Sequence, residues 1–323
     1  MNILMKFSKA VMVLALGGIL VSSCKDDDDS SSTYYSLSGS LSVGAEMPSY
    51  VNPGDVFNFE SSGVSLPESE TDEDVKLYFT YKNSVDNVKD TVSTYTVTIP
   101  EMLGEYTVTA TAEASGYYTK TVTQTTTVVS AKSLTGCDRS SLSQVTDSRD
   151  GKQYRQVTVN GKWWFAENLA YYEKDADGNY TFGSSYEAVK ATEDIMGGFY
   201  SWEDAQTACP SGWRLPTLEE WNALGDTAGD FMCDAYFNGS RLWEFWPDVK
   251  VTNKLNLYLM PFGYATVVDG EYTFTGFNDY AFYWVNDGGK PKCKYIYVAT
   301  PKVLNWEDPS ETDFAAQVRC VKE

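Results

Sequence analysis

The stretch FYSWEDAQTACPSGWRLPTLEEWNAL, residues 199–224, decides the fold of the second half of this chain. It predicts two short helices, separated by a Pro-Ser-Gly segment that ends the first of them. Each helix opens with a hydroxyl residue that an acidic residue follows three positions later: Ser201 with Asp204, and Thr217 with Glu220. This spacing is typical of the capping box, in which the two side chains bind each other's backbone amides.

Strands are expected on both sides of these helices. Upstream, residues 145–172 (VTDSRDGKQYRQVTVNGKWWFAENLAYY) predict a hairpin, because their Asn-Gly pair suits a type I′ turn. Downstream, residues 256–287 predict a strand, a turn at an Asp-Gly pair and a second strand, and the closing AAQVRCVKE predicts a last strand. The two helices are therefore expected to lie between strands that are distant in sequence.

Together these segments resemble the Fibrobacter succinogenes major paralogous domain, a family of repeated, mostly exported modules. The motifs that carry the resemblance follow the family order: DSRDGKQYRQVTVNGKWWFAENL, YSWEDAQTACPSGWRLPTLEEW, LMPFGY, YWVND and VRCVKE. The family is similar to the C-type-lectin-like and formylglycine-generating-enzyme folds. The resemblance therefore implies a compact α+β domain over residues 137–323, with its termini in one sheet and a long loop region on one side.

Five cysteines follow Cys24, and an odd number leaves at least one thiol unpaired or intermolecular in an oxidising compartment. In folds of the resembled kind, the cysteine after the first helix bonds to one in the last strand. The resemblance therefore implies a disulfide between Cys209 and Cys320.

The partner in a second disulfide stays open at this point. Family members often carry a cysteine where this chain has Trp163, so Cys137 lacks its usual partner. Two alternatives remain. We favour Cys233–Cys293 slightly over a bridge that includes Cys137.

Residues 34–131 predict a separate β domain. Residues alternate with a period of two in VKLYFTYK (75–82), TYTVTIP (94–100) and GEYTVTATAEA (104–114), which indicates short strands of a β-sandwich. The run GEYTVTATAEASGYY resembles immunoglobulin-like or PKD-like domains. The expected fold class is thus multidomain: an all-β immunoglobulin-like sandwich, which we expect to serve as a rigid stalk, followed by an α+β C-type-lectin-like domain.

The first 33 residues predict export and a lipid anchor. Residues 1–23 join two lysines to an apolar run that is too short to span a membrane, which is typical of a signal peptide. Small residues before Cys24 resemble a bacterial lipobox, which implies a diacylglycerol on its sulfur. Residues 24–33 (CKDDDDSSST) predict a flexible acidic tether and resemble the surface-export signal of lipoproteins in the Bacteroidota. We expect an outer-membrane protein, lipid-anchored and exposed at the cell surface.

Composition argues against several functions. The net charge of −20 repels phosphate backbones and argues against nucleic acid as a partner. The sequence has no histidine, which removes histidine-based triads, imidazole acid–base catalysis and the usual catalytic zinc sites. Formylglycine-generating relatives act through late cysteines, of which only Cys293 is left once Cys320 is assigned to a disulfide. We therefore expect no enzymatic activity.

Candidate ligand-binding residues lie in the second half of the chain: Tyr283, Trp284, Asn305, Trp306, Glu307 and Asp308. Aromatic faces stack on sugar rings, while carboxylates and amides bind the hydroxyls. Trp243 and Trp246 are further aromatic candidates. The segment NWEDPSETD (305–313) also supplies hard oxygen ligands, so Ca²⁺ is the one candidate cofactor.

These observations favour a non-catalytic binding module at the cell surface, for glycan capture or adhesion. The rival class is a protein-binding or structural component of the surface, fimbrial or otherwise. A surface glycoside-active enzyme, built on a pair of carboxylates, ranks below both.

Overall fold

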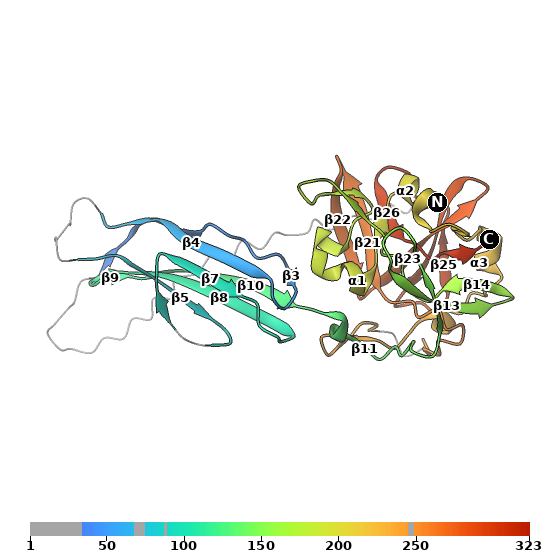
Figure 1. Cartoon of the computed structure of the whole chain (residues 1–323), viewed down its shortest axis with the longest axis horizontal. Helices are drawn as coiled ribbons and strands as arrows, with labels where there is room; N and C mark the ends of the chain where they lie inside the picture. Colours follow the sequence, from blue (N-terminus) through green and yellow to red (C-terminus); the bar gives the residue numbers. More distant parts are fainter. Residues whose placement is uncertain (1–33, 68–74, 87–88, 245–248) are drawn as a thin grey trace.

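The computed structural model describes residues 34–67, 75–86, 89–244 and 249–323. An elongated stalk and a wider head lie end to end (Figure 1). The predictions for residues 1–33, which include the signal peptide, the Cys24 anchor and the acidic tether, lie outside the described residues, as does Trp246. No helix within the described ranges is long and apolar enough to cross a bilayer.

The stalk consists of strands in three sheets. Its strands are β1 (Tyr35–Ser36), β2 (Ser38–Val43), β3 (Tyr50–Val51), β4 (Val56–Ser65), β5 (Tyr78–Asn83), β6 (Asp90–Thr91), β7 (Thr94–Thr98), β8 (Gly104–Glu113), β9 (Tyr117–Tyr118) and β10 (Lys120–Val128). One sheet has the order β3-β10-β8-β5-β6, a second β2-β4-β7, and β1 pairs with β9.

The two larger stalk sheets share one hydrophobic core. Phe59 and Val97 from the three-stranded sheet pack in the same cluster as Tyr81 and Tyr106 from the five-stranded sheet. Burial alternates along β8, as a strand with one covered face requires. The predicted β domain is therefore confirmed as a two-sheet structure, and its immunoglobulin-like assignment stays a prediction.

Aromatic side chains pack the stalk against the head. The ring of Tyr50, on β3, lies 6.2 Å from the ring of Tyr186 and 6.1 Å from that of Phe237, both in the head. Val129, which follows β10, is fully buried in the same head cluster. Burial raises the pKa of the Tyr50 hydroxyl, and the charge of Glu187 adds to the effect. The joint is thus a packed interface and not a bare linker.

The head carries many short strands. They are β11 (Leu134–Thr135), β12 (Ser143–Thr146), β13 (Gln153–Val159), β14 (Lys162–Phe165), β15 (Glu173–Lys174), β16 (Tyr180–Phe182), β17 (Phe199–Tyr200), β18 (Trp213–Arg214), β19 (Tyr236–Phe237), β20 (Ser240–Arg241), β21 (Phe262–Val268), β22 (Glu271–Phe277), β23 (Tyr280–Asp287), β24 (Lys290–Tyr297), β25 (Val303–Trp306), β26 (Phe314–Gln317) and β27 (Val321–Lys322).

Helices in the head are few and short. They are the 3₁₀ turns η2 (Ala131–Ser133), η3 (Tyr186–Ala188) and η4 (Lys190–Thr192), and the α-helices α1 (Glu193–Met196), α2 (Trp202–Ala208), α3 (Leu218–Asn222) and α4 (Ala228–Phe231). The head is therefore mostly β, with less helix than an α+β domain was expected to have. The C-type-lectin-like comparison stays a prediction.

The predicted helices form where the sequence placed them, with one difference at a cap. Thr217 and Glu220 make the reciprocal capping box at the start of α3. At α2, the Ser201 side chain accepts from the amide of Asp204, but Oδ2 of Asp204 accepts from the amide of Gly183 at 3.0 Å. This carboxylate therefore binds the backbone after β16 and does not complete a reciprocal capping box at α2.

Two sheets organise the head. The first has the order β12-β13-β14-β27-β18, so the C-terminal strand β27 lies between the first hairpin and the strand that follows α2. The second has the order β17-β26-β21-β23-β24-β25, with β22 paired to β21. Residues that are far apart in sequence thus meet in both sheets (Figure 1).

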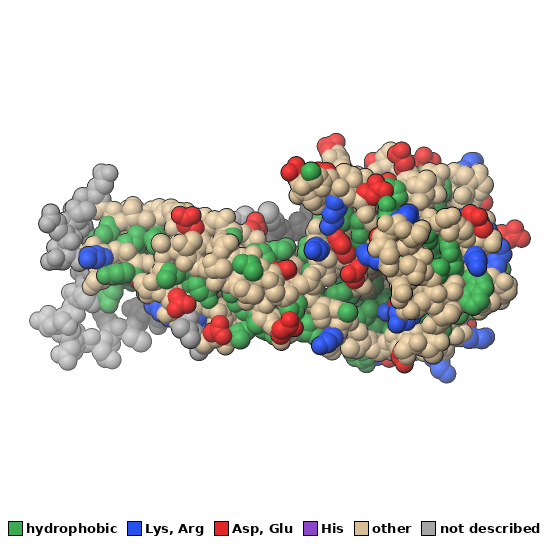
Figure 2. Space-filling model, viewed as in Figure 1, with side chains coloured by type: hydrophobic (Ala, Val, Ile, Leu, Met, Phe, Trp, Pro, Cys, Tyr) green, Lys and Arg blue, Asp and Glu red, His purple; other side chains and the backbone are tan. Residues whose placement is uncertain are grey.

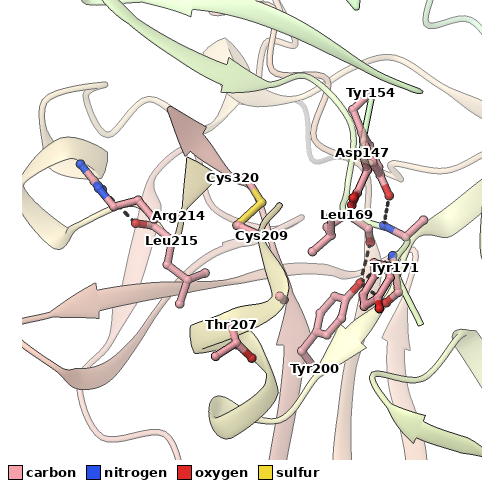
Figure 3. Close-up of a disulfide and its surroundings, with 12 residues drawn as sticks. Asp147, Tyr154, Leu169, Tyr171, Tyr200, Thr207, Cys209, Arg214, Leu215 and Cys320 are labelled. Atoms are coloured by element: carbon pink, nitrogen blue, oxygen red, sulfur yellow. Dashed lines mark hydrogen bonds between the residues drawn. A yellow bond between two sulfur atoms is a disulfide. The ribbon is translucent and has the colours of Figure 1, made fainter. Parts of the chain in front are cut away.

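A disulfide joins the end of α2 to the last strand. Cys209 and Cys320 are bonded, with their Cα atoms 5.8 Å apart, and Figure 3 shows the bridge beside Leu215 and Tyr200. The hydroxyl of Tyr200 lies 2.9 Å from the carbonyl oxygen of Tyr171, which ties β17 to the loop after β14. The pairing implied by the family resemblance is the one that the structure has.

The second disulfide differs from the pairing that we favoured. Cys233 bonds to Cys137, with Cα atoms 6.1 Å apart, and Cys293 is a buried free thiol. Cys233 and Cys137 pack in one small cluster, within the Cα range that a bridge requires. Cys293 lies on β24, in register between Trp284 and Trp306, so its side chain belongs to a different core.

Candidate functional site

One face of the seven-stranded sheet carries a continuous group of aromatic side chains, which we call the aromatic platform. Its members come from five strands: Tyr264, Tyr280, Phe282, Tyr295, Tyr297, Trp306 and Phe314. Two of them, Phe282 and Phe314, are only 5% and 2% exposed and form the floor. Trp306 is 37% exposed, and the four tyrosines are half-buried. The platform is therefore a solvent-facing surface with a rigid base.

Strand register explains how the rings come together. Tyr280 lies opposite Tyr297, and Phe282 lies opposite Tyr295, in the antiparallel pair β23–β24. Side chains two residues apart on a strand share a face, so each pair continues the row of the next. The centroids of the two pairs lie 4.7 and 4.6 Å apart, with interplanar angles of 14° and 5°. Such stacked cross-strand aromatic pairs stabilise a sheet and hold neighbouring rings in a fixed arrangement.

Trp306 closes one side of the platform. Its ring lies 4.7 Å from that of Phe314 and 5.8 Å from that of Phe282, edge-on to both. Tyr264 lies on the other side, 4.9 Å from Phe282. Each exposed ring is therefore held by a buried phenylalanine, which fixes its orientation before any ligand arrives.

The tyrosine hydroxyls of the platform are free to bind a ligand. Burial raises the pKa values of Tyr264, Tyr280 and Tyr295, so each keeps its proton at neutral pH. Within the part of the chain that the structure describes, these hydroxyls and that of Tyr297 form no hydrogen bond. The platform thus offers apolar faces together with several unused donors.

A charged pair joins β24 to the residue after β25, with Lys292 opposite Val285 on the sheet face away from the platform. Nζ of Lys292 donates to Oε2 of Glu307 at 2.9 Å and to the backbone oxygen of Glu307 at 2.7 Å. The hydrogen bond with Glu307 raises the pKa of Lys292, which therefore stays charged. Asn305 and Asp308 are exposed beside this pair, and Asn305 alternates with Trp306 on β25. Three of the predicted polar candidates thus lie near one another.

Two predicted residues lie in the core and not at the surface. Tyr283 is fully buried on the opposite face of β23, where its ring stacks 5.6 Å from that of Trp221. Trp284 shares the face of Phe282 but is covered by α2: its ring lies 5.4 Å from Trp202, and its Nε1 donates to the carbonyl of Tyr200 at 2.8 Å. Adjacent strand residues point to opposite faces, so Tyr283 and Trp284 cannot belong to one ligand-binding surface. Both side chains are also fully buried.

Trp243 is also a core residue. It is fully buried, and its indole nitrogen donates to the carbonyl of Leu259 at 3.2 Å.

Sequence reasoning missed the platform tyrosines, although the sequence contained a signal for them. Aromatic residues at every second position of 280–284, with a second such series at 295 and 297, would have placed them on one face.

A calcium ion would need more oxygen ligands than the side chains of Glu307 and Asp308 supply. Within the described ranges, no group of three or more histidine, cysteine, aspartate or glutamate side chains is arranged to hold a metal ion. The Glu307 carboxylate is moreover engaged by Lys292. Calcium stays a prediction for the loop that follows β25.

The fold and the aromatic surface define a class: a two-body, disulfide-bonded β protein with a ligand-sized apolar face on its head. The chain belongs to the Fibrobacter succinogenes major domain family, whose model matches residues 157–322. The match covers α2, α3, the whole seven-stranded sheet and every platform residue, and it confirms the resemblance seen in the sequence motifs. No curated protein is significantly similar to the chain.

Proposed function

We propose that this protein is a surface lipoprotein whose head binds carbohydrate through the aromatic platform. The observation that carries the proposal is the row of partly exposed aromatic rings on one sheet face, in which Tyr280 stacks on Tyr297 and Phe282 stacks on Tyr295. Pyranose rings present C–H faces that pack on such surfaces, and this stacking is worth more when the rings are already oriented. The protein itself would make no covalent change to the ligand.

Polar groups around the platform would give the proposed site its selectivity. The tyrosine hydroxyls supply hydrogen-bond donors and acceptors on the platform face. Removing such a polar partner leaves its counterpart unpaired, which is how a small number of hydrogen bonds discriminates among sugars. Calcium, if the ligand requires it, would enter beside Asp308.

The N-terminal segment and the stalk would attach the head to the outer membrane and hold it outside the cell. A lipid on Cys24 would hold the mature chain in the outer membrane, and the tether of residues 25–33 would reach at most about 30 Å. The immunoglobulin-like stalk would then carry a C-type-lectin-like head outward. The net charge of −20 is consistent with a partner other than nucleic acid.

A glycan array tests the proposal directly. The full chain, purified in a detergent without a sugar headgroup, is applied with Ca²⁺ and again with a chelator. We expect binding to a restricted set of glycans that Trp306→Ala abolishes. Trp163→Ala is the matched control, because Trp163 is 38% exposed, as Trp306 is, but lies on the β13–β14 hairpin.

Two results would reject carbohydrate binding. One is an array that stays silent in both conditions, which would shift weight to the rival class, a protein-binding or structural surface component. The other is a glycan signal that Trp163→Ala and Trp306→Ala reduce equally, because the platform would then have no special role.

A further inference from the structure

A cavity in the head, separate from the aromatic platform, is lined by several basic side chains. Its volume is about 370 Å³, and no residue of the aromatic platform lines it. Five segments form its walls: the loop before β12, the start of β13, the loop after β14, the α1 region and the start of β21. The charged and amide side chains among the lining residues are Arg139, Lys152, Gln153, Arg155, Glu167, Asn168 and Asp194. In a protein with a net charge of −20, such a concentration of cations is unexpected.

One carboxylate serves two guanidinium groups in this cavity. Oε1 of Glu167 lies 3.6 Å from Nε of Arg139 and 3.3 Å from NH1 of Arg155. The second oxygen of Glu167 accepts from the backbone amide of Arg155 at 2.8 Å. Nε of Arg155 is buried and has no hydrogen-bond partner within the described residues. Neither guanidinium has the two-pronged carboxylate contact that arginine favours.

A third guanidinium lies directly behind the cavity wall. Arg319 is only 1% exposed, and its Nε donates to Oδ1 of Asn168, a lining residue, at 2.7 Å. Its other hydrogen bonds go to the backbone oxygens of Phe165, Leu257 and Tyr258, all of them neutral. Three arginines thus share the field of a single carboxylate. Their excess positive charge acts in a partly desolvated space, where charges interact strongly.

The fourth cation of the cavity, Lys152, already has a hydrogen-bond partner and an ionic partner. Nζ of Lys152 donates to the carbonyl of Ala170 at 2.6 Å and lies 3.1 Å from the carboxylate of Asp194. The Asp194 side chain is 76% exposed, so water screens this pair. On the other side, Met260 and Phe262 give the cavity an apolar wall.

We propose that this cavity binds the carboxylate of a small acidic sugar, such as a hexuronate. The carboxylate would complete the hydrogen bonds of Arg139 and Arg155, and the ring would pack its C–H face against Met260 and Phe262. A volume of about 370 Å³ lies at the small end of ligand sites, which suits a single sugar residue and not a polymer segment. This second site does not rest on the aromatic platform.

Calorimetric titration of D-galacturonate into the full chain in detergent tests the proposal, with galactose as the neutral comparison. We expect saturable binding of galacturonate and not of galactose. Arg139→Gln should weaken it at least about tenfold, because a charge-assisted hydrogen bond is lost. Glu167→Gln should instead strengthen it, because the competing carboxylate disappears. Lys302→Gln, which removes a cation paired with Asp226 outside the cavity, should change nothing.

Arg139→Gln and Glu167→Gln are expected to change the affinity for galacturonate in opposite directions. A general loss of structure would weaken binding in both variants. Should Arg139→Gln fail to fold, Lys152→Gln replaces it, with the same expected direction. Equal binding of galactose, absence of galacturonate binding at millimolar concentration, or weaker binding by Glu167→Gln would each overturn the proposal. Trp306→Ala should leave galacturonate binding intact, so failure of the platform and failure of this cavity are distinguishable.

Discussion

Nε of Arg319 donates a 2.7 Å hydrogen bond to Oδ1 of Asn168, which joins two sequence motifs that lie 151 residues apart. Asn168 follows β14 in the segment FAENL, and Arg319 precedes the disulfide in VRCVKE. Asn168 in turn donates to the carbonyl of Met196 at 2.9 Å, so the contact continues to the end of α1. Both motifs are thus parts of one buried polar network that organises the head.

Arg319→Lys should lower the free energy of unfolding by about 2–4 kcal/mol, because lysine lacks the planar fork and leaves buried carbonyls without donors. All nine tryptophans follow residue 162 in the sequence and none belongs to the stalk strands, so tryptophan fluorescence during urea unfolding reports on the head. The exposed Arg241, changed in the same way, should cost less than about 1 kcal/mol. Equal effects of the two substitutions would contradict the network.

Gly197→Ala should destabilise the head more than Gly212→Ala. Both glycines have positive φ angles, +79° and +78°, so backbone strain of about 1–2 kcal/mol is common to both. A Cβ on Gly197 would lie 2.5 Å from Cβ of Asn168, whereas one on Gly212 would meet nothing within 4 Å. We expect an additional loss of about 1–3 kcal/mol at Gly197. Matching urea midpoints for the two variants would show that the close contact relaxes freely.

Removing the Cys209–Cys320 disulfide should cost about 4–5 kcal/mol, because the bond closes a loop between residues 111 apart. The test is the double variant Cys209→Ala/Cys320→Ala, followed by thermal unfolding. Cys293→Ala removes a buried thiol that carries no bridge, so only a packing loss of about 1 kcal/mol is expected. A double variant as stable as Cys293→Ala would mean that the bridge does not constrain the unfolded chain.

The head should lose stability in acid, because protonation of Glu220 removes a stabilising ion pair. The side-chain hydrogen bonds from Arg214 lower the pKa of Glu220 from 4.5 to about 2, and burial opposes this shift while Lys162 and the Thr217 amide add to it. Its stabilising contribution is therefore complete above pH 4.5 and is lost as the pH falls toward 2. Glu220→Gln should flatten the dependence of unfolding free energy on pH in this window. The exposed Glu311→Gln should keep the parent slope, and an unchanged slope in both would contradict the assignment.

Cys24→Ala should release the protein from membranes, because no lipid can then be attached. Fractionation of cells, with the protein detected in pellet and supernatant, measures this. Ser23→Ala is the control, since it leaves the cysteine in place and the protein should still sediment. A Cys24→Ala protein that remains in the membrane pellet would reject the anchor.

Much of the local structure could be predicted from sequence, because its determinants are local. The capping box of Thr217 and Glu220, the period of two in β8 and the family motifs are each contained in a short segment. The Cys209–Cys320 bridge followed from the resemblance and not from the residues themselves. The second bridge could not be assigned, because nothing near Cys137 or Cys233 in sequence indicates that they share a cluster.

The candidate site was predicted only at its edge. Trp306 was found because the segment NWEDPSETD resembles a lectin calcium motif, whereas Tyr280 and Tyr295 lie in segments that also suit a core. Their exposure depends on how far α2 extends over the sheet, and it covers Trp284 but not these tyrosines. The basic cavity joins five distant segments, so only the tertiary structure shows that Glu167 is shared by two arginines.

The packing of Tyr50 between Tyr186 and Phe237 has a mechanical consequence. Since this contact stops the head from swinging on its stalk, drag on a captured ligand would pass along the strands as tension and would not be absorbed by rotation.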